Sequence, residues 1–438
     1  MENKANDPEE IVGDIVAPPP EVPKKKKRNR RPKSKKGKNK PTGFEEYYVD
    51  PPITAEEHEF EQSFYDVSRP IIHRMEDALL RFQKNRRIET ERLEVFHKYL
   101  AYGGVNVSPK IFAGTIDRDL KEMDKDQILL ARGQTAIDQD NSHLTIDFNA
   151  VVKGYLTSYF PFVFNPENEE MIKLATTTIR SFLSYLLYHD VCPEYKENID
   201  EARKSCDIAE KELWRNQQLM ANEPGDFNKA CSTLFGGLEY DLYVDNGHWR
   251  NPKEHTVQIT KNIARKVVKF GLAVSGSDQL AKSFQHMDEC AMLEGTMLED
   301  IDGFEVVETV FLSEGHRKFY QDHAPDLHPV GVLRGRTYCD PGSPEYDLSP
   351  EEREEWSRRG RPTRELTFFL EESLLKHCYP GMKIITTVWE INCGFHYFED
   401  IKKVYASIYT VLANDLMIGW KKPRDLAAKD EEDESDAE

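Results

Sequence analysis

The chain has 438 residues, a formal net charge of −19 at pH 7 and 39% hydrophobic residues, which is enough for a sizeable core. Its longest apolar clusters are too short or too interrupted by polar residues to cross a bilayer, which excludes a protein with spanning helices. Seven widely spaced cysteines and the lack of a signal peptide predict free thiols in a soluble, intracellular protein.

The first part of the chain has the composition of a disordered arm. Twelve of the seventeen residues from Lys24 to Lys40 are Lys or Arg, and none is apolar, so burial cannot offset the entropy of ordering. Removing these twelve positive charges from the total of −19 leaves −31 for the remainder, so any nucleic-acid contact is expected to be local to the arm. Such a run is typical of a nuclear-import signal or a nucleic-acid contact, and a merely solubilising tail is the plainer alternative. The candidate residues are Lys24, Lys25, Lys26, Lys27, Arg28, Arg30, Arg31, Lys33, Lys35 and Lys36.

Three amphipathic helices are predicted next. Thr54 and the acids after it are typical of the start of a helix over residues 55–65. Ser68 is expected to cap a second helix, and Gly103-Gly104 to end a third. The apolar stripe of the second helix consists of Ile72, Met75, Leu79 and Phe82. The cations that end it suit either the helix dipole or a phosphate-facing patch, and they are Arg81, Lys84, Arg86 and Arg87.

The middle of the chain continues as helices, with one short exception. Leu144–Phe148 alternates like a strand, and residues 151–164 are predicted to be helical and buried. Asn165-Pro166-Glu167 is expected to open a helix that ends near His189 and forms the centre of the helical core. The nearly heptad spacing of apolar residues from Pro193 to Met220 predicts a helix that packs against the body.

The C-terminal half is expected to mix strands and helices. A short helix over Phe227–Phe235 and an amphipathic basic helix over Val257–Val274 are predicted first. A last helix is expected from about Asp400 to Met417, before an acidic tail. The predicted strands are Phe304–Leu312, Val330–Tyr338, Glu365–Leu370 and Met382–Ile391.

The expected fold class is therefore α+β, with a helix-dominated N-terminal half and a mixed C-terminal half. The predicted organisation is a disordered arm over residues 1–43, a mainly helical region over 44–250, an α+β region over 251–420 and an acidic disordered tail over 421–438. Whether the two folded regions are one domain or two closely packed domains stays open.

Catalytic and metal-binding patterns are weak. The sequence has no phosphate-cradling glycine loop, serine elbow or paired CxxC motif, so we predict no catalytic residue and no cofactor. A hydrolase with scattered carboxylates would need buried acids that cluster in the fold. Three His or Cys pairs have different spacings, so we predict no metal site and expect buried thiols and hydrogen-bonded histidines. These pairs are Cys393 with His396, His323 with His328, and His286 with Cys290.

Two short segments mix cations with aromatic residues, as single-strand-binding surfaces do. They are Lys318-Phe319-Tyr320 and Arg334-Gly335-Arg336-Thr337-Tyr338. A strand face with alternating charge is the commoner explanation, and it is the one we expect.

Several segments carry a family resemblance. The basic run leading into Lys40–Tyr47 and then Asp50–Thr54, the segment Phe96–Gly104, the run Pro224–Asn228 with Ala230–Gly237, and the segment Tyr379–Lys383 resemble the Argonaute-binding subunit of the fungal Argonaute siRNA chaperone (ARC) complex. The resemblance extends over nearly the whole chain, and none of these segments is a catalytic signature.

The resemblance implies a non-catalytic subunit that binds Argonaute carrying duplex siRNA, together with a second accessory subunit. Such a subunit would restrain passenger-strand cleavage or release and support RNAi-directed heterochromatin formation. It would contact siRNA through Argonaute, act in the nucleus and also the cytoplasm, and have no membrane partner. From the residues alone, the alternative is an autonomous nuclear RNA- or DNA-binding protein that acts through its basic arm.

Two tryptophans are candidates for partner binding. The resemblance draws attention to Gly419-Trp420, because Argonaute proteins have pockets that accept tryptophan beside glycine on flexible partners. Trp356 lies among charged residues and is expected to be more exposed. Alternatively, Trp420 closes the core with Met417 and Ile418.

Overall fold

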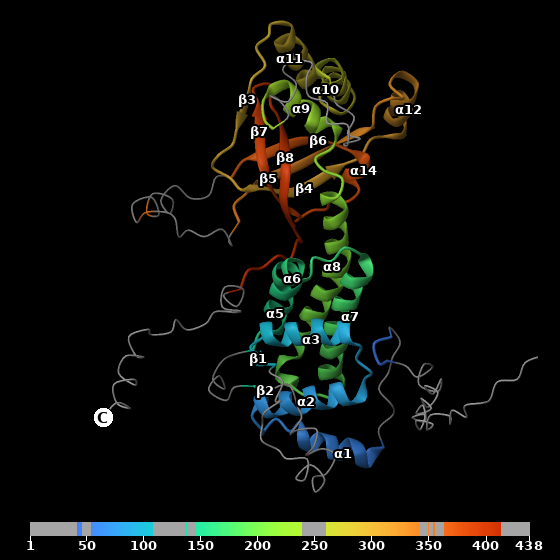
Figure 1. Ribbon diagram of the computed structural model, residues 1–438, viewed down its shortest axis with the longest axis vertical. Coiled ribbons are helices and arrows are strands. Elements are labelled where there is room, and N and C mark those ends of the chain that lie inside the picture. The colour runs from blue at the N-terminus through green and yellow to red at the C-terminus, as the bar shows by residue number, and fades with distance from the viewer. Residues whose placement is uncertain are drawn as a thin grey trace, which may run out of the picture. The chain divides into compact units, whose positions relative to one another are not determined.

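The computed structural model describes residues 42–45, 54–107, 136–137, 146–238, 260–340, 349, 354 and 363–412. Helices dominate the described residues up to Leu238, and a six-stranded sheet is built from residues after Glu294, which confirms the α+β class (Figure 1). None of the helices in these described ranges is long and apolar enough to cross a membrane.

The helical part has one aromatic core. Phe82 lies at its centre, with ring centroids 5.4 Å from Phe96, 5.2 Å from Phe182 and 5.5 Å from Tyr185. The prediction that the helix ending near His189 forms the centre of this core is confirmed, because nine of its residues are buried. The elements are α1 (Ala55–Phe64), α2 (Ile71–Asn85), α3 (Thr90–Tyr102), β1 (Val105–Asn106), β2 (Ala136–Ile137), α5 (Phe148–Gly154), the π-helical turn η4 (Tyr155–Tyr159), α6 (Phe160–Phe164), α7 (Glu169–Tyr188), η5 (Pro193–Tyr195) and α8 (Lys196–Met220).

Helix α8 belongs to two cores. Its buried residues from Ile199 to Leu213 pack in the helical core, whereas Leu219 near its end packs in the core of the sheet. The predicted packing of this helix against the body is therefore confirmed, and the same helix links the two parts of the fold.

The sheet closes on itself as a barrel. Strand β4 pairs with β5 and β7, β5 pairs with β6, and β8 pairs with β7. The ring closes where Phe368 of β6 lies opposite His396 of β8 in parallel orientation. The strands are β3 (Gly295–Met297), β4 (Gly303–Val310), β5 (Val330–Tyr338), β6 (Glu365–Glu371), β7 (Lys383–Ile391) and β8 (Phe395–Tyr405).

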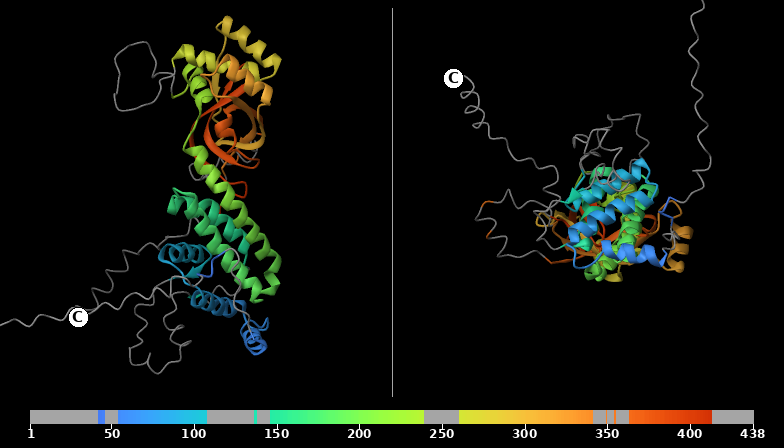
Figure 2. Two further views of the ribbon diagram at one scale, coloured as in Figure 1. Left: turned by 90° about the vertical axis from the view of Figure 1, so that its right-hand side faces the viewer. Right: turned by 90° about the horizontal axis from the view of Figure 1, so that it is seen from below.

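Side chains alternate between the inside and the outside of this barrel. Phe304, Phe368 and Phe398 meet inside it, with the Phe304 and Phe368 rings stacked at 4.2 Å. The outward side of β5, β6 and β8 forms another core with α9, α10 and α11 (Figures 1 and 2). The helices of this part of the chain are α9 (Asp226–Phe235), α10 (Lys261–Ser275), α11 (Asp278–Glu289), α12 (Glu314–His323) and α14 (Glu372–Leu375).

Two predicted helix caps are wrong. Helix α2 begins after Pro70, and Ser68 lies in the preceding turn, where its N–H donates to Asp66 Oδ1 at 2.8 Å. The proline holds the residue before it in extended backbone, so the helix starts later. Asn165 has a φ of +40° and ends α6, while Asn168 caps α7 by accepting from the Met171 N–H at 2.8 Å. Asparagine favours both positions, so its type alone did not distinguish them.

The predicted strand Leu144–Phe148 is wrong at its described end. Asp147 caps α5 by accepting from the Ala150 N–H at 2.9 Å, and Phe148 is the first residue of that helix. Its apolar side chain packs into the helical core and does not continue an alternating strand. Residues 144 and 145 lie outside the described residues.

The predicted helix from Asp400 is also wrong, because residues 395–405 form β8. Strand β8 pairs with β7 along its length, from Phe395 opposite Ile391 to Tyr405 opposite Lys383. Ile401, Val404 and Ile408 have helix-like spacing, but pairing with a strand distant in sequence overrides that local pattern. The end of the predicted helix, residues 413–417, lies outside the described residues.

Candidate functional site

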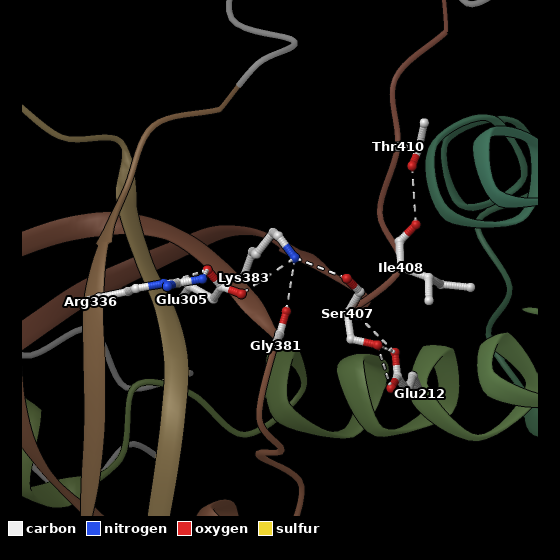
Figure 3. Close-up of polar contacts among 8 residues, drawn as sticks. All are labelled: Glu212, Glu305, Arg336, Gly381, Lys383, Ser407, Ile408 and Thr410. Carbon is white, nitrogen blue, oxygen red and sulfur yellow. Dashed lines mark hydrogen bonds and ion pairs between the residues drawn. The ribbon is translucent and has the colours of Figure 1, made fainter. Parts of the chain in front are cut away.

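Polar side chains from three elements meet where α8 approaches the barrel (Figure 3). Glu212 of α8 accepts from the N–H and the hydroxyl of Ser407, both at 2.8 Å. Lys383 of β7 donates to the carbonyl oxygens of Gly381 at 3.0 Å and Ser407 at 3.1 Å, and its Nζ lies 3.9 Å from Glu305. We call these five residues the junction cluster.

Burial shifts the pKa values of two charged groups in the junction cluster. It raises the pKa of Glu212, although the two bonds from Ser407 work in the opposite direction. It also lowers the pKa of Lys383, although Glu305 and Glu212 favour its charged form. A partly buried cation therefore lies near the Glu305 carboxylate and is connected to Glu212 through Ser407, an arrangement that holds these elements together.

Helix α8 makes further polar contacts on the same face. Arg215 donates to the carbonyl oxygens of Lys376 and Cys378, both at 2.8 Å. The Tyr379 hydroxyl donates to Asn216 Oδ1 at 2.6 Å. Residues three and four apart share a helix face, so 212, 215 and 216 together fix α8 against residues 376–383. The family-like segment Tyr379–Lys383 thus lies at this junction.

A cavity of about 280 Å³ lies beside the start of α9, and we call it the α9 pocket. Glu223 accepts from the Ile401 N–H at 2.6 Å, and burial raises the pKa of its carboxyl to about 7, with Asp400 adding to the effect. At neutral pH this carboxyl is shared between its two forms, so the pocket suits a cationic or hydrogen-bond-donating group. The pocket is lined by Glu223, Pro224, Asn228, Lys229, Ser232, Leu238, Glu399 and Asp400.

Glu399 fixes the far wall of the α9 pocket. Its Oε1 accepts from the Ser232 hydroxyl and from the Leu238 N–H at 3.0 Å, and its Oε2 accepts from Trp389 Nε1 at 3.0 Å. Gly237 has a φ of +117°, and a Cβ there would overlap the Glu399 carboxylate. Glycine is therefore required where the backbone passes this side chain.

The geometry of both sites uses segments that the sequence had already marked as family-like. A family model described as Argonaute siRNA chaperone (ARC) complex subunit Arb1 matches residues 32–423. The chain belongs to the Arb1 family. The resemblance predicted from the sequence is confirmed.

One relative of the Arb1-family chain is a protein of Schizosaccharomyces pombe (strain 972 / ATCC 24843) named Argonaute-binding protein 1. The two are 30% identical over 217 residues, which cover 48% of this chain and 51% of the relative. The aligned part therefore spans about half of each protein. No solved structure matches the chain.

None of the site residues predicted from the sequence lies within the described residues. The arm residues from Lys24 to Lys36, Trp356 and Trp420 all lie outside the described residues. The junction cluster and the α9 pocket were missed by the sequence reasoning. Family-like segments marked one side of each site. Glu212, which accepts from Ser407, and Glu399, which accepts from Ser232, are distant in sequence from their partners and have no local signal.

The cations at the end of α2 are at least partly structural. The guanidinium of Arg86 lies 4.2 Å from the centre of the Phe82 ring, and its Nε donates to the Gly43 carbonyl at 3.2 Å. Arg81 lies over the Phe64 ring at 4.1 Å. These contacts hold the ends of the helical core, so the described geometry favours a packing role over a phosphate-facing patch.

The two mixed cationic and aromatic segments have different structures. On β5, Arg334 pairs with Glu308 at 2.9 Å and Arg336 pairs with Glu305 at 2.7 Å, both across to β4, which is the expected strand face of alternating charge. The same expectation is wrong for Lys318–Tyr320, because this segment lies in a helix, α12. There Tyr320 is buried, whereas Phe319 is 43% exposed.

Two lysines of the predicted basic helix, α10, have acidic partners. Lys266 lies 2.6 Å from Asp326, and Lys269 lies 2.6 Å from Asp288. The helix is amphipathic as predicted, although Ile263 at its start is 45% exposed. Pairing reduces the positive field that this face would offer to a phosphate backbone.

One histidine of the three predicted pairs, His396, has a hydrogen-bond partner within the barrel. The Thr367 N–H donates to His396 Nδ1 at 3.2 Å, and burial lowers the pKa of this histidine. Across the described ranges, no three His, Cys, Asp or Glu side chains are grouped so that they could hold a metal ion.

Proposed function

We propose that this chain is a non-catalytic subunit of an Argonaute siRNA chaperone complex and binds Argonaute that carries duplex siRNA. The observation that carries the proposal is the family match over residues 32–423, which includes every described residue. A relative named Argonaute-binding protein 1 supports the choice of partner.

The mechanism we propose is a bias between two states of Argonaute. The folded part docks on Argonaute and binds the duplex-loaded state more tightly than the state that has lost its passenger strand. A difference of about 1 to 3 kcal/mol in binding free energy would shift occupancy roughly five- to 150-fold. Passenger-strand cleavage or release is thereby restrained, and siRNA contacts this chain mainly through Argonaute.

The basic arm has a separate role in this proposal. Residues Lys24 to Lys40 direct nuclear import or contact RNA phosphates in a salt-dependent way. The acidic remainder of the chain leaves this contact local to the arm. A second accessory subunit completes the complex, which acts in the nucleus and also the cytoplasm and supports RNAi-directed heterochromatin formation.

The surface that docks on Argonaute is proposed to include the α9 pocket. Its carboxylates would accept a basic side chain of the partner, and Trp356 or Trp420 would insert into a pocket on Argonaute as an aromatic anchor. The charge reversal Asp400→Lys at the pocket rim should then lower the recovery of Argonaute. Lys402→Glu, a reversal at an exposed position of β8 outside the pocket lining, is the matched control.

The testing experiment is purification of the tagged full chain from its own cells, with mass spectrometry of the proteins and sequencing of the small RNA. Recovery of Argonaute together with double-stranded small RNA is the expected result. Recovery of neither, from an intact and folded protein, would overturn the proposal. Recovery of RNA without Argonaute would favour the autonomous nucleic-acid-binding alternative.

A further inference from the structure

The strand order of the barrel carries information about ligand class. Strands β4, β5 and β6 form an antiparallel meander, β4 also pairs with β7, and β7 pairs with β8. The third and fifth barrel strands, β6 and β8, close the ring in parallel, and the short helix α14 lies between the third and fourth. This is the connectivity of the OB-fold, a five-stranded Greek-key barrel that binds oligonucleotides and oligosaccharides.

Strand β3 strengthens the assignment. It precedes β4 and pairs with the far end of β7, with Gly295 opposite Ile391, while β4 pairs with the near end, with Gly303 opposite Ile385. The two segments together act as one long, bent first strand. Strand β4 also has a register shift between Val306 and Glu308, which bends it further around the barrel.

In an OB-fold, the ligand lies on the second and third strands and contacts the loops that follow the first and fourth strands. On this face, aromatic rings stack on the bases and basic groups contact the phosphates of single-stranded nucleic acid. In this chain the corresponding face belongs to β5 and β6, and the loops are residues 311–329 and 392–394. Its outward side chains include Val330, Val332 and Phe369, since Phe368 and Leu370 point inward.

Helices α9 and α10 occupy this face. Phe369 of β6 is only 1% exposed, and its ring lies 5.3 Å from the ring of Phe227 in α9. The Phe227 N–H also donates to Glu371 Oε1 at 2.6 Å. From α10, Ser275 donates its hydroxyl to the Val330 carbonyl, and Gly271 lies so close that a Cβ there would be 2.9 Å from the Phe227 ring.

The same helical layer reaches both loops. Phe270 of α10 stacks on Phe319 of α12 at 5.7 Å, in the loop after the first barrel strand. Beyond α11, the carbonyl of Met292 accepts from Asn392 Nδ2 at 2.8 Å, in the loop after the fourth barrel strand. The left view of Figure 2 shows helices of this part of the chain packed against the barrel. The helical layer therefore follows the path that single-stranded nucleic acid would take across an OB-fold.

The cations near this face have other partners. Arg334 and Arg336 are the outward-facing cations of β5, and each forms an ion pair with a glutamate of β4. The Phe369 ring, which could stack a base, is thus buried under α9, and Arg334 and Arg336, which could contact phosphate, are paired with carboxylates.

We propose that the barrel is an OB-fold whose single-strand-binding face is filled by the chain's own helices α9 and α10. Single-stranded RNA consequently makes no contact with β5 and β6, and any direct RNA contact lies elsewhere in the chain. The inference concerns the barrel alone and holds whether or not the chain binds Argonaute.

The test is photo-crosslinking of the purified full chain to single-stranded RNA that carries 4-thiouridine, with crosslinked peptides identified by mass spectrometry. Binding is measured in parallel by fluorescence anisotropy. We expect no crosslinked peptide from residues 330–338 or 365–371, and an unchanged Kd, within about twofold, for the double variant Arg334→Ala with Arg336→Ala. Undetectable RNA binding by the full chain agrees with the proposal too. Crosslinks to either strand, or a tenfold weaker Kd for the double variant, would overturn it.

A second measurement tests whether α10 covers the outward face of β5 and β6. Gly271→Leu should push α10 from the barrel, so hydrogen exchange of α10 and of β6 should rise together. Gly315→Leu is the control, because a Cβ added at Gly315 in α12 would meet only the Ser313 Oγ, at 3.8 Å. Faster exchange in α10 with β6 unchanged would show that the helix does not cover this face.

Discussion

The Glu371 carboxylate lies against the backbone of Gly225, so that a Cβ built on Gly225 would overlap Oε2 and lie 3.1 Å from the carboxyl carbon. Glu371 ends β6 and Gly225 precedes α9, and the other carboxylate oxygen accepts from the Phe227 N–H. This contact joins α9 to the barrel. It also explains why the family-like run Pro224–Gly237 includes a glycine at this position.

Replacement of Gly225 by alanine should therefore destabilise the fold by two separate effects. Gly225 has a φ of +87°, which costs an alanine about 1 to 2 kcal/mol, and the overlap with Glu371 adds a further cost. Urea unfolding of the full chain measures the sum. Gly104→Ala is the matched control, because Gly104 has a φ of +86° and no neighbouring atom within 4 Å of the added Cβ. Equal losses for the two variants would show that the Glu371 contact contributes nothing.

Glu371→Gln should change the pH dependence of stability. Burial raises the pKa of this carboxyl from 4.5 to about 7. As the pH rises, the unfolded chain therefore loses this proton at a lower pH than the folded protein does. The free energy of unfolding should fall by about 3 kcal/mol between pH 4.5 and pH 7 because of this group, and then level off. The glutamine variant lacks this component.

The measurement for Glu371→Gln is the urea midpoint as a function of pH. Glu223 also has a pKa of about 7, so it contributes a pH dependence of stability with the same sign. Glu223→Gln is therefore measured alone and in combination with Glu371→Gln. A profile for Glu371→Gln that parallels the unmodified protein from pH 4.5 to 7 would contradict the assignment.

Ser407→Ala should weaken the attachment of α8 to the barrel. It removes the hydroxyl donor of Glu212 and leaves this partly buried carboxylate with the Ser407 N–H, at an expected cost of about 1 to 2 kcal/mol. A double-mutant cycle with Glu212→Ala isolates the coupling, and Lys211→Ala on an exposed side of α8 is the control. A coupling free energy near zero would mean that the two residues are neighbours without mutual stabilisation.

Local sequence patterns were sufficient for much of the fold. The strands β4 to β7 fall within one or two residues of their predicted bounds, because Val, Ile and aromatic residues form short runs with clear ends. Strand β8 was missed because Ile401, Val404 and Ile408 have helical spacing, and only pairing with β7 determines their conformation.

The candidate sites could not be predicted from local sequence patterns, for a related reason. Glu212 and Ser407 are 195 residues apart, and Glu223 and Ile401 are 178 residues apart, yet each pair shares a hydrogen bond. Such contacts depend on how the barrel closes, which no spacing in the sequence reports. Glycine was the one visible signal, because a residue such as Gly237 with positive φ marks a close approach of the backbone.

Deletion of residues 1–40 should separate the roles of the arm and the folded part. Import, or salt-sensitive association with RNA, should be reduced, because twelve positive charges between Lys24 and Lys40 are removed. Recovery of Argonaute should be unchanged. Fluorescence microscopy, RNA recovery at two salt concentrations and mass spectrometry measure these three properties in the same cells. Loss of Argonaute on this deletion would end the proposed division of roles.

Trp420→Ala and Trp356→Ala test the aromatic anchors. If one of these side chains inserts into a pocket on Argonaute, its removal should cost about 2 kcal/mol or more of binding free energy, or roughly a 30-fold weaker Kd. The matched control is Phe162→Ala, since Phe162 on α6 is an aromatic residue that is 87% exposed and belongs to neither candidate. Each variant is first checked by urea unfolding, because an equal loss of stability would indicate that the ring packs in the core. Full retention of binding by both folded tryptophan variants would place the Argonaute contact on other residues, with the rim of the α9 pocket tested next through Asp400→Lys.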